Sequence, residues 1–505
     1  MYSSKEIDLK SKSFLALILG TLTVLGFAPF YYFPVPVITI LLLFYLWRSS
    51  TKPWHSAVIG FSFGMGLFGA GVTWLYVSLH DFGGMPLPIA VVALLLLCAY
   101  LSLFPALTGW FTTKIRHIHF SAWAACVSAC WVMSEWLRGT LFTGFPWLTL
   151  GYSQVPASPL IGYAPILGVY GISLLLVFSI ALYIAWPKQK NLNHYLWILG
   201  GIWVSGYGLQ HYQWVDPEGS PITVSLLQGN ISQDLKWRED HLVSTMNTYA
   251  DLVLESNSRL IVTPEISIPL FYEDVPTDYL TLLSDHAKQN QGDVLIGFAE
   301  TVPHSIDRNE YYNSMFSMGS SPEQRYRKHH LVPFGEFIPF KPLFGWIIQV
   351  LNIPLSDFSR GSLDQQPLDL AGQKVAINIC YEDVFGEEII LQLPQASILV
   401  NVSNDAWFGR SIGPRQHLQI SQMRALETGR YMLRATNTGV TAIINERGQI
   451  VQELEMFVTQ GLHGTAQGFK GATPYVQYGN TLVLTIIGLC LSLGGFIAFF
   501  RKEND

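Results

Sequence analysis

A cysteine, a lysine and a glutamate in the second half of the chain have the side chains that acyl transfer requires. Cys380 ends the apolar run "KVAINIC" and directly precedes Tyr381 and Glu382. Lys328 stands in "YRKHHLVPFGEF", and Glu265 ends "RLIVTPE". A free thiol has a pKa of about 8.5 and is mostly protonated at neutral pH, so it needs a base to become a nucleophile. A carboxylate can take that proton, and an ammonium group can stabilise the oxyanion that forms.

Taken singly, each of these three residues has an ordinary structural explanation. A carboxylate at the end of a strand is usually solvated or caps a helix. A lysine before two histidines is usually surface charge, and a buried cysteine often acts as a small hydrophobic side chain. Their joint occurrence is what predicts acyl transfer through a thioester on Cys380, because together they form a chemically complete set.

Predicted strands position these residues. Between residues 220 and 470, short β-branched runs alternate with helix-like stretches such as 241–256 and 414–431. The runs are "PITVSLLQ", "RLIVTPE", "DVLIGFAE", "KVAINIC", "ASILVNVS" and "TAIINE". Runs of this kind between polar or turn residues are typical of buried strands. The pattern predicts an α/β layered domain, and in that class functional side chains gather where strands end.

The rest of the chain is much more apolar. A bilayer core of about 30 Å requires about 20 mostly apolar residues in a helix. The candidate spans are 13–33, 34–47, 56–79, 86–113, 119–137, 163–186, 195–213 and 480–500. The second is short and begins with Pro34 and Pro36, so a re-entrant segment is the alternative. No small-residue cleavage site follows the first, so we expect it to be retained rather than removed as a signal peptide.

The distribution of positive charge predicts the orientation of these spans, since Lys and Arg favour cytoplasmic loops. With the N-terminus inside, eleven Lys and Arg residues fall in cytoplasmic segments and only Arg138 falls in a short outward loop. We therefore expect a multi-pass α-helical membrane bundle over 1–215 with about seven transmembrane helices. An exported catalytic domain would cover 216–475, and an eighth transmembrane helix and a cytoplasmic tail would cover 476–505.

The cysteines and charges limit the chemistry further. Cys98, Cys126, Cys130 and Cys490 lie in predicted membrane helices, which leaves Cys380 without a disulfide partner in the exported domain. Cys126 and Cys130 have the i, i+4 spacing of a metal pair, but no His or acidic residue is near them, so we predict helix packing and no metal. The net charge of −6 and the absence of a basic run argue against nucleic acid. No Gly-rich phosphate loop is present, and we predict no cofactor.

The order Glu265, Lys328, Cys380, with "TPE", "KHHLVPFGE" and "CYED", resembles the nitrilase superfamily of carbon-nitrogen hydrolases. A nitrilase-like domain between seven helices and a final one is similar to the apolipoprotein N-acyltransferase family. The resemblance extends to "QGNISQDLKW", "GFPWLTLGY" and "VNVSNDAWFG" and covers nearly the whole chain. It implies an αββα sandwich for the exported domain. Ser232, where many relatives would have proline, is a small departure that puts no site residue in doubt.

The resemblance also implies roles for single residues. Glu265 would be the general base, Lys328 the oxyanion stabiliser and Cys380 the acylated nucleophile. Supporting roles around the pocket are implied for Trp237, Glu336, Tyr381 and Glu382.

The residues themselves suggest how some of these supports would act. Glu336 could fold back past the Pro-Phe-Gly turn to orient Lys328, or it could be a surface carboxylate. Glu382 could support the pocket or cap a helix. Trp237 could line the pocket or pack in the core. Asn404, Asp405 and Trp407 could shape a loop near the site or form a structural turn.

Membrane helices beside a nitrilase-like domain indicate lipid substrates. The resemblance implies that Cys380 takes an acyl chain from a phospholipid and passes it to the α-amine of a diacylglyceryl-cysteine on an apolipoprotein, in ping-pong order. It places the chain in the bacterial inner membrane as a monomer, with a periplasmic catalytic domain. A membrane-tethered amidase that passes the acyl group to water is the enzymatic alternative. A transporter or sensor with an inactive domain is a second alternative.

Several segments are candidates for the lipid entry. The apolar segment 337–355 could dip into the interface or pack in the core. The outward loops 80–86 and 137–154 could complete the portal, with Trp147 as a lipid contact or simply an interface anchor. Glu135 and Arg138, three residues apart near a helix end, could form a structural pair or serve function.

Overall fold

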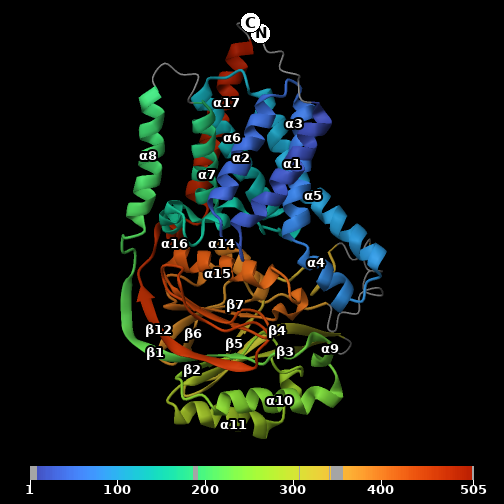
Figure 1. Cartoon of the computed structure of the whole chain (residues 1–505). Helices are drawn as coiled ribbons and strands as arrows, with labels where there is room; N and C mark the ends of the chain where they lie inside the picture. The colour runs from blue at the N-terminus through green and yellow to red at the C-terminus, as the bar shows by residue number, and fades with distance from the viewer. Residues whose placement is uncertain (1–7, 186–191, 306–307, 340–341, 343–356, 503–505) are drawn as a thin grey trace. The chain divides into compact units, whose positions relative to one another are not determined.

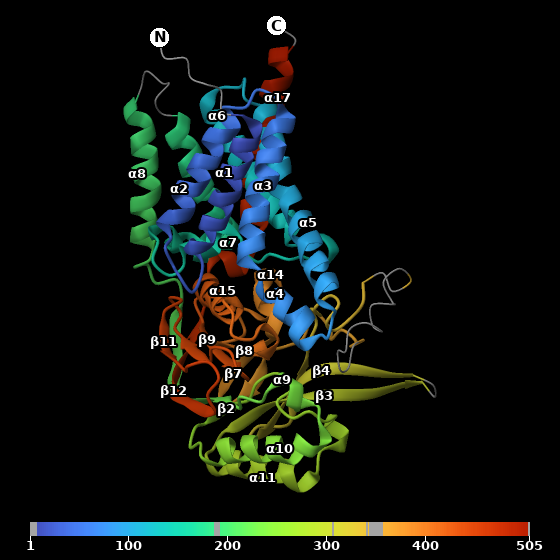
Figure 2. The ribbon, with the colours of Figure 1, turned by 45° about the vertical axis from the view of Figure 1, so that its right-hand side comes forward.

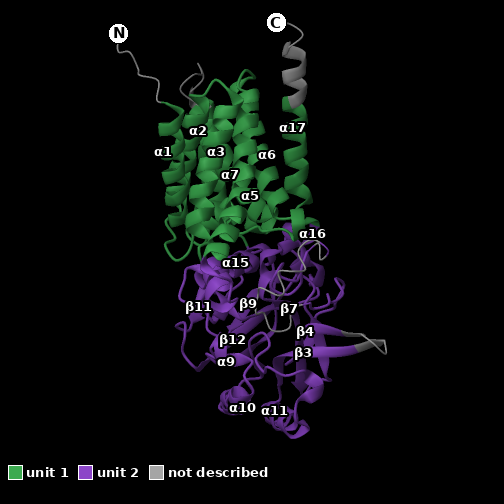
Figure 3. Cartoon of the chain, turned by 90° about the vertical axis from the view of Figure 1, so that its right-hand side faces the viewer, with its two compact units in different colours: residues 1–73, 88–212, 478–505 green, residues 74–87, 213–477 purple. Residues whose placement is uncertain are grey.

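The computed structural model describes residues 8–185, 192–305, 308–339, 342 and 357–502. The chain divides into two compact units, shown in different colours in Figure 3. The first comprises Met1–Thr73, Pro88–Tyr212 and Tyr478–Asp505. The second comprises Trp74–Leu87 and Gln213–Gln477.

The first unit is built of helices. They are α1 (Leu9–Thr23), α2 (Pro34–Arg48), α3 (Pro53–Gly71), α5 (Leu87–Lys114), α6 (Phe120–Arg138), α7 (Ala164–Ala185), α8 (Leu192–Leu209) and α17 (Thr481–Lys502). Short 3-10 turns lie at Val24–Gly26, Leu141–Thr143, Leu150–Gln154 and Pro159–Tyr163. Each candidate span therefore contains a helix.

Only some of these helices are long and apolar enough to cross a bilayer on their own. Among the described residues they are Leu9–Gly26, Leu87–Lys114 and Pro159–Ile184, with a fourth if a bent pair that includes α3 counts as one span. Pro34–Arg48 and Thr481–Gly494 are apolar but shorter. Membrane crossing by three or four segments is thus supported by length and composition, and the count of eight stays a prediction.

Small residues explain the close packing of α1 on α3. A Cβ atom on Gly20 would lie 1.9 Å from the carbonyl oxygen of Phe63, and one on Gly66 would lie 2.0 Å from that of Leu17. Neither position can hold a side chain unless the backbones separate. Small residues at such contacts let helices associate where the surroundings are as apolar as the side chains.

The helix predicted over 56–79 is not one straight helix. α3 ends at Gly71, and the chain bends by 58° before α4 (Trp74–Tyr76) and a π-helical turn (Val77–Phe82). In the second unit, Trp74 Nε1 donates a hydrogen bond to Gln416 Oε1 at 3.2 Å, and Ser78 Oγ donates to the carbonyl oxygen of Trp407 at 2.8 Å. These long-range contacts override the apolar pattern that predicted a single span.

The described part of the second unit contains two six-stranded sheets. The first has the order β12-β1-β2-β3-β4-β5 and the second the order β11-β10-β9-β8-β7-β6. The strands of the first sheet are β1 (Asp216–Gln228), β2 (Leu260–Val262), β3 (Asp293–Ser305), β4 (Arg308–Gly319), β5 (Gln324–Arg327) and β12 (Gln460–Lys470). Those of the second are β6 (Leu368–Leu370), β7 (Gln373–Ile379), β8 (Ile398–Ser403), β9 (Tyr431–Thr436), β10 (Ala442–Ile444) and β11 (Ile450–Glu453).

The centre of each sheet is parallel, and its edges are antiparallel. β1, β2 and β3 run parallel, as do β7, β8 and β9. The long antiparallel pair β3–β4 forms the ribbon that Figure 2 shows side-on. Every strand predicted from a β-branched run is present, because those runs are the buried strands of the two sheets.

The two sheets pack face to face and carry helices on their outer faces. Apolar side chains of β1, β2 and β3 meet those of β7, β8 and β9 in one buried cluster. α10 (Glu239–Leu254) and α11 (Thr277–Gln289) cover the first sheet, and α15 (Gly413–Thr428) covers the second (Figure 1). Burial of each Val, Leu or Ile side chain contributes about 1.5–3 kcal/mol. The predicted αββα sandwich is confirmed.

Candidate active site

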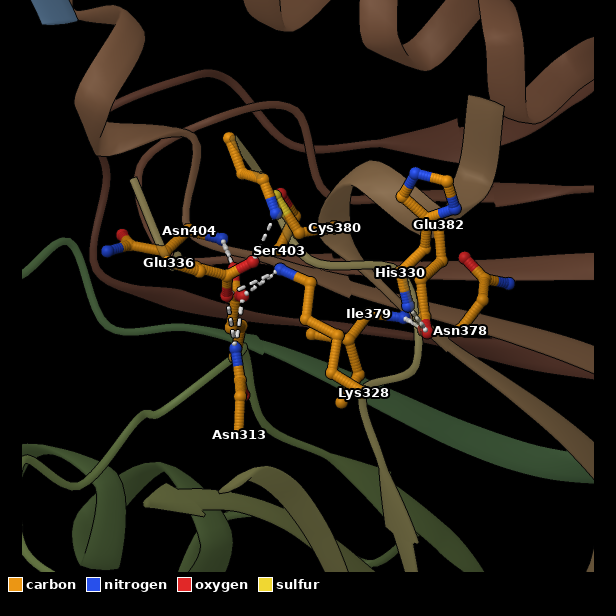
Figure 4. A network of polar contacts seen from close by, with 12 residues as sticks. Asn313, Lys328, His330, Glu336, Asn378, Ile379, Cys380, Glu382, Ser403 and Asn404 are labelled. Carbon is orange, nitrogen blue, oxygen red and sulfur yellow. Dashed lines mark hydrogen bonds and ion pairs between the residues drawn. The ribbon is translucent and has the colours of Figure 1, made fainter. Parts of the chain in front are cut away.

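The site forms where strands of both sheets end. Glu265 lies three residues after β2, and Lys328 comes directly after β5 in the same sheet. Cys380 directly follows β7 of the second sheet, and Asn404 directly follows β8. Figure 4 shows side chains from both sheets converging on this point.

A buried ion-pair network lies at its centre. Lys328 Nζ is 3.0 Å from Glu265 Oε1 and 2.8 Å from Glu336 Oε1. The Lys328 side chain is only 1% exposed. Burial alone would lower the pKa of Lys328, but the negative charges of Glu265 and Glu336 outweigh burial and raise it well above its usual value. Lys328 is therefore a permanent ammonium group, held between two carboxylates.

Glu265 is fixed at both of its carboxylate oxygens. Asn313 Nδ2 donates to Oε1 at 2.7 Å, and the backbone N–H of Asn404 donates to Oε2 at 2.9 Å. Burial would raise the pKa of Glu265, but the charge and hydrogen bond of Lys328, the Asn313 amide and the charge of Lys236 outweigh it and lower the pKa. The carboxylate is thus ionised at neutral pH and can accept a proton.

Cys380 is the first residue of the 3-10 turn η8 (Cys380–Val384), which directly follows β7. Its φ of 55° lies in the left-handed region, which costs a residue other than glycine on the order of 1–3 kcal/mol. Its side chain is partly buried. Burial, assisted by the negative charge of Glu265 and opposed by Lys328, raises the pKa of the Cys380 thiol. The resting sulfur is therefore protonated, and it would need a base to become a nucleophile.

Glu382 connects the turn at Cys380 to the turn that holds Lys328. Its carboxylate accepts backbone N–H groups from Ile379 at 2.6 Å and His329 at 2.6 Å, and the hydroxyl of Tyr326 at 3.1 Å. Burial raises the pKa of Glu382 to about 7, although these N–H groups partly oppose the shift. Glu382 thus caps the turn and supports the site at once.

The other predicted supports have varied surroundings. Glu336 bonds Lys328, and its Oε2 accepts the Val332 N–H at 2.8 Å. The Tyr381 ring packs edge-on against Phe385, with 5.3 Å between centroids. Trp237 packs against an apolar cluster of Ile266, Leu331 and Phe358.

The predicted lipid-entry residues lie partly in the first unit. Trp147 is 2% exposed and stacks on Phe145 with 6.2 Å between ring centroids. Glu135 Oε1 accepts the N–H of Leu150 at 2.9 Å, and Arg138 donates to the carbonyl oxygens of Phe145 and Trp147 at 2.7 and 2.5 Å. Of the segment 337–355, residues 340–341 and 343–355 lie outside the described residues.

Two side chains at this site were not predicted from the sequence. Asn313 lies within β4, where nothing in "EYYNSMFS" distinguishes it. Lys236 ends the short helix α9 (Gln233–Lys236), is 4% exposed and donates to the carbonyl oxygen of Glu265 at 3.4 Å. Burial lowers the pKa of Lys236 to about 8, although the negative charge of Glu265 opposes the shift. Its position beside Trp237 in "DLKW" was the only available signal.

A thiol, an ionised carboxylate and a fixed ammonium at the strand ends of an αββα sandwich define a class of protein. Residues 223–462 match the family model of the carbon-nitrogen hydrolases, so the second unit carries a domain of that class. Residues 19–182 match the model of the apolipoprotein N-acyltransferase N-terminal domain. No group of three or more His, Cys, Asp or Glu side chains in the described ranges could hold a metal ion.

Similarity to whole proteins extends over both units. The chain is 68% identical over 491 residues to the apolipoprotein N-acyltransferase of Nitrosomonas europaea, covering 97% of this chain and 98% of that one. It is 43% identical over 497 residues to the apolipoprotein N-acyltransferase of Methylococcus capsulatus, covering 97% and 96%. The chain belongs to the apolipoprotein N-acyltransferase family.

Proposed function

We propose that this protein moves a fatty acyl chain from a phospholipid to the α-amine of a diacylglyceryl-cysteine at the N-terminus of an apolipoprotein, through a thioester on Cys380. One observation carries the proposal. A protonated thiol on a strained turn shares a buried site with an ionised carboxylate that is bonded to a permanent ammonium group. The names of the relatives supply the substrate class.

The first half-reaction forms the thioester. Glu265 takes the thiol proton as the Cys380 sulfur attacks the ester carbonyl carbon of the phospholipid. The carbonyl π electrons move to oxygen, and Lys328 stabilises the oxyanion that results. When the oxyanion collapses, the ester C–O bond breaks, Glu265 returns the proton to the glycerol oxygen, and a lysophospholipid leaves.

The second half-reaction forms the amide. The neutral α-amine attacks the thioester carbonyl, Lys328 again stabilises the oxyanion, and Glu265 takes a proton from the attacking nitrogen. The C–S bond then breaks, and the proton passes to the Cys380 sulfur. The free thiol and the ionised Glu265 are restored, so two bulky lipids use one site in turn.

The proposal includes a place in the cell. We place the chain in the bacterial inner membrane with eight spans, both termini in the cytoplasm and the catalytic unit in the periplasm. The apolar helices support membrane residence. The excess of Lys and Arg in the predicted cytoplasmic segments supports the orientation.

Intact-protein mass spectrometry tests the proposal. Purified protein incubated with a diacyl phospholipid should gain the mass of one acyl chain, which hydroxylamine removes and Cys380→Ala abolishes. A diacylglyceryl-cysteine peptide added afterwards should discharge the adduct and become an amide. An adduct that persists in Cys380→Ala would contradict the assignment of the nucleophile, and steady release of free fatty acid without the peptide would favour a hydrolase.

A further inference from the structure

A cluster of buried charged residues lies next to the backbone carbonyl group of Cys380. It consists of His417 on α15, Asp383 on η8, Asp405 on the 3-10 turn η10 (Asp405–Phe408) and Arg434 on β9. All four residues are no more than 1% exposed. The acyl-transfer steps proposed above use none of them.

Both ring nitrogens of His417 face oxygen atoms that can only accept hydrogen bonds. Nδ1 lies 3.1 Å from Asp405 Oδ1, and Nε2 lies 3.2 Å from the carbonyl oxygen of Cys380. A neutral imidazole has one N–H and one lone pair, so it could satisfy only one of these contacts and would point its lone pair at the other oxygen. Only the doubly protonated ring donates to both.

The charges of the neighbouring groups lead to the same conclusion. Arg434 lies 2.8 Å from Asp405 and 3.7 Å from Asp383, and His417 Nε2 lies 3.9 Å from Asp383. Two carboxylates and one guanidinium leave one negative charge uncompensated in a site closed to water, which is strongly unfavourable. Burial would raise the pKa of Asp405, but Arg434 and His417 outweigh it and hold that pKa well below its usual value. A positively charged His417 makes the cluster neutral.

We infer that His417 is a buried imidazolium that fixes the peptide of Cys380 in its left-handed conformation and places a positive charge behind the sulfur. It is a positioning residue, since it acts through Cys380, and the inference rests on the proposed role of Cys380 as nucleophile. Asn401 Nδ2 gives the same carbonyl oxygen a second, longer hydrogen bond of 3.4 Å.

The same cluster is connected to the proposed base. Ser403 Oγ donates to Asp405 Oδ1 at 2.7 Å, and the intervening residue Asn404 donates its N–H to Glu265. Asp405 therefore fixes the end of β8, where the Asn404 N–H bonds Glu265. Through His417, Asp405 also fixes the end of β7, which carries Cys380. The imidazolium ties the nucleophile and the base to one buried carboxylate.

A double-mutant cycle tests the charge. His417→Gln retains an amide donor for the Cys380 carbonyl but leaves the cluster with one excess negative charge. Asp383→Asn leaves it with one excess positive charge, and the double variant is neutral. We expect each single substitution to lower the midpoint of thermal unfolding of the full-length protein and the double variant to recover part of the loss. Strictly additive losses, or stabilisation by Asp383→Asn alone, would overturn the inference.

Alkylation of Cys380 by iodoacetamide tests the effect on the sulfur and requires no lipid. We expect His417→Gln to move the pH profile of the alkylation rate upward by about one pH unit, a tenfold lower rate on its rising limb. The rate is measured by mass spectrometry of the peptide that contains Cys380. His286→Gln is the matched control, because the His286 ring also contacts a backbone carbonyl oxygen, that of Ser256 at 2.7 Å, away from the site.

The alkylation result separates the two proposals. An unshifted profile in His417→Gln would reject the imidazolium, whatever the acyl-transfer assay shows. A shifted profile in a protein that forms no acyl adduct would retain the imidazolium and reject the thioester.

Discussion

Glu135 and Arg138 in the first unit, and Glu265 and Lys328 in the second, are each a buried acidic and a buried basic residue. The two sets are bonded differently. In the first unit, Glu135 accepts the N–H of Leu150 and the indole N–H of Trp131, and Arg138 donates to backbone carbonyl groups. In the second unit, Glu265 and Lys328 bond each other at 3.0 Å, and the charges of both act on the Cys380 thiol.

The buried charges of the first unit stabilise the backbone of a neighbouring segment, whereas those of the second unit lie beside a candidate nucleophile. Glu135 and Arg138 direct hydrogen bonds to the segment 145–150, whose backbone groups would otherwise be buried without partners. Both oxygens of the Glu265 carboxylate accept hydrogen bonds, and its partner Lys328 lowers its pKa, so an ionised carboxylate lies in the same site as the Cys380 thiol. Residue type and burial alone do not distinguish the two sets, whereas their bonding does.

Glu265→Gln should give the largest change. The amide cannot take the thiol proton, and removal of a general base lowers a rate by about 10²–10⁴-fold. Acyl-adduct formation on Cys380 should fall by that factor in a quenched time course read by mass spectrometry. Glu300→Gln is the control, since Glu300 is also a buried, ion-paired carboxylate of the same unit. Adduct formation at the wild-type rate in Glu265→Gln would remove Glu265 from the role of base.

Lys328→Met should slow adduct formation by about 10²–10³-fold, the usual effect of losing one oxyanion donor. It should also change the pH dependence. Burial raises the pKa of Glu265, and Lys328 is the main group that lowers it, so without Lys328 the pKa of Glu265 rises. The fall in rate on the acid side should begin at a higher pH in the variant. If the rate falls on the acid side at the same pH in the variant as in wild type, Lys328 does not set the ionisation of Glu265.

Lys236→Met should have a smaller effect, about tenfold on adduct formation, because Lys236 donates to the backbone carbonyl of Glu265 and acts on its carboxylate through space, as a shift of about one pKa unit. The pKa of Lys236 is about 8, so the wild-type rate should decline above that pH as the charge is lost. This decline should be absent from Lys236→Met and present in the surface control Lys288→Met. Its persistence in Lys236→Met would assign it to another group.

Glu135→Leu should leave the rate of adduct formation per folded molecule within about twofold of wild type, while stability falls. The Leu150 N–H and the Trp131 indole N–H would lose their acceptor, and each buried donor left unpaired costs about 1–3 kcal/mol. Thermal unfolding and adduct formation, measured on one preparation, check the expected loss of stability and the expected unchanged rate. A large loss of rate in well-folded protein would end the contrast between the two sets of charges.

Local patterns predicted the framework of the second unit well. β7 and β8 lie where "KVAINIC" and "ASILVNVS" predicted them, and α10 begins two residues before the predicted 241–256. Such runs are readable because neighbouring side chains of a strand or helix face fixed directions. The bend after Gly71 was missed, since the apolar pattern continues through it and the contacts that favour it, Trp74 to Gln416 among them, join residues 342 positions apart.

By itself, the sequence determined the buried strands and the candidate site residues at their ends, because both depend on the order of side chains along one segment. It could not supply Asn313, Lys236 or the environment of His417, whose importance arises from atoms on other strands and helices. Only the tertiary structure decided which carboxylate bonds Lys328, which N–H groups hold Glu265, and where a buried charge needs a counter-charge. Hydrogen bonds and charges act over a few ångströms in space, and folding brings together at that range residues that are far apart in the chain.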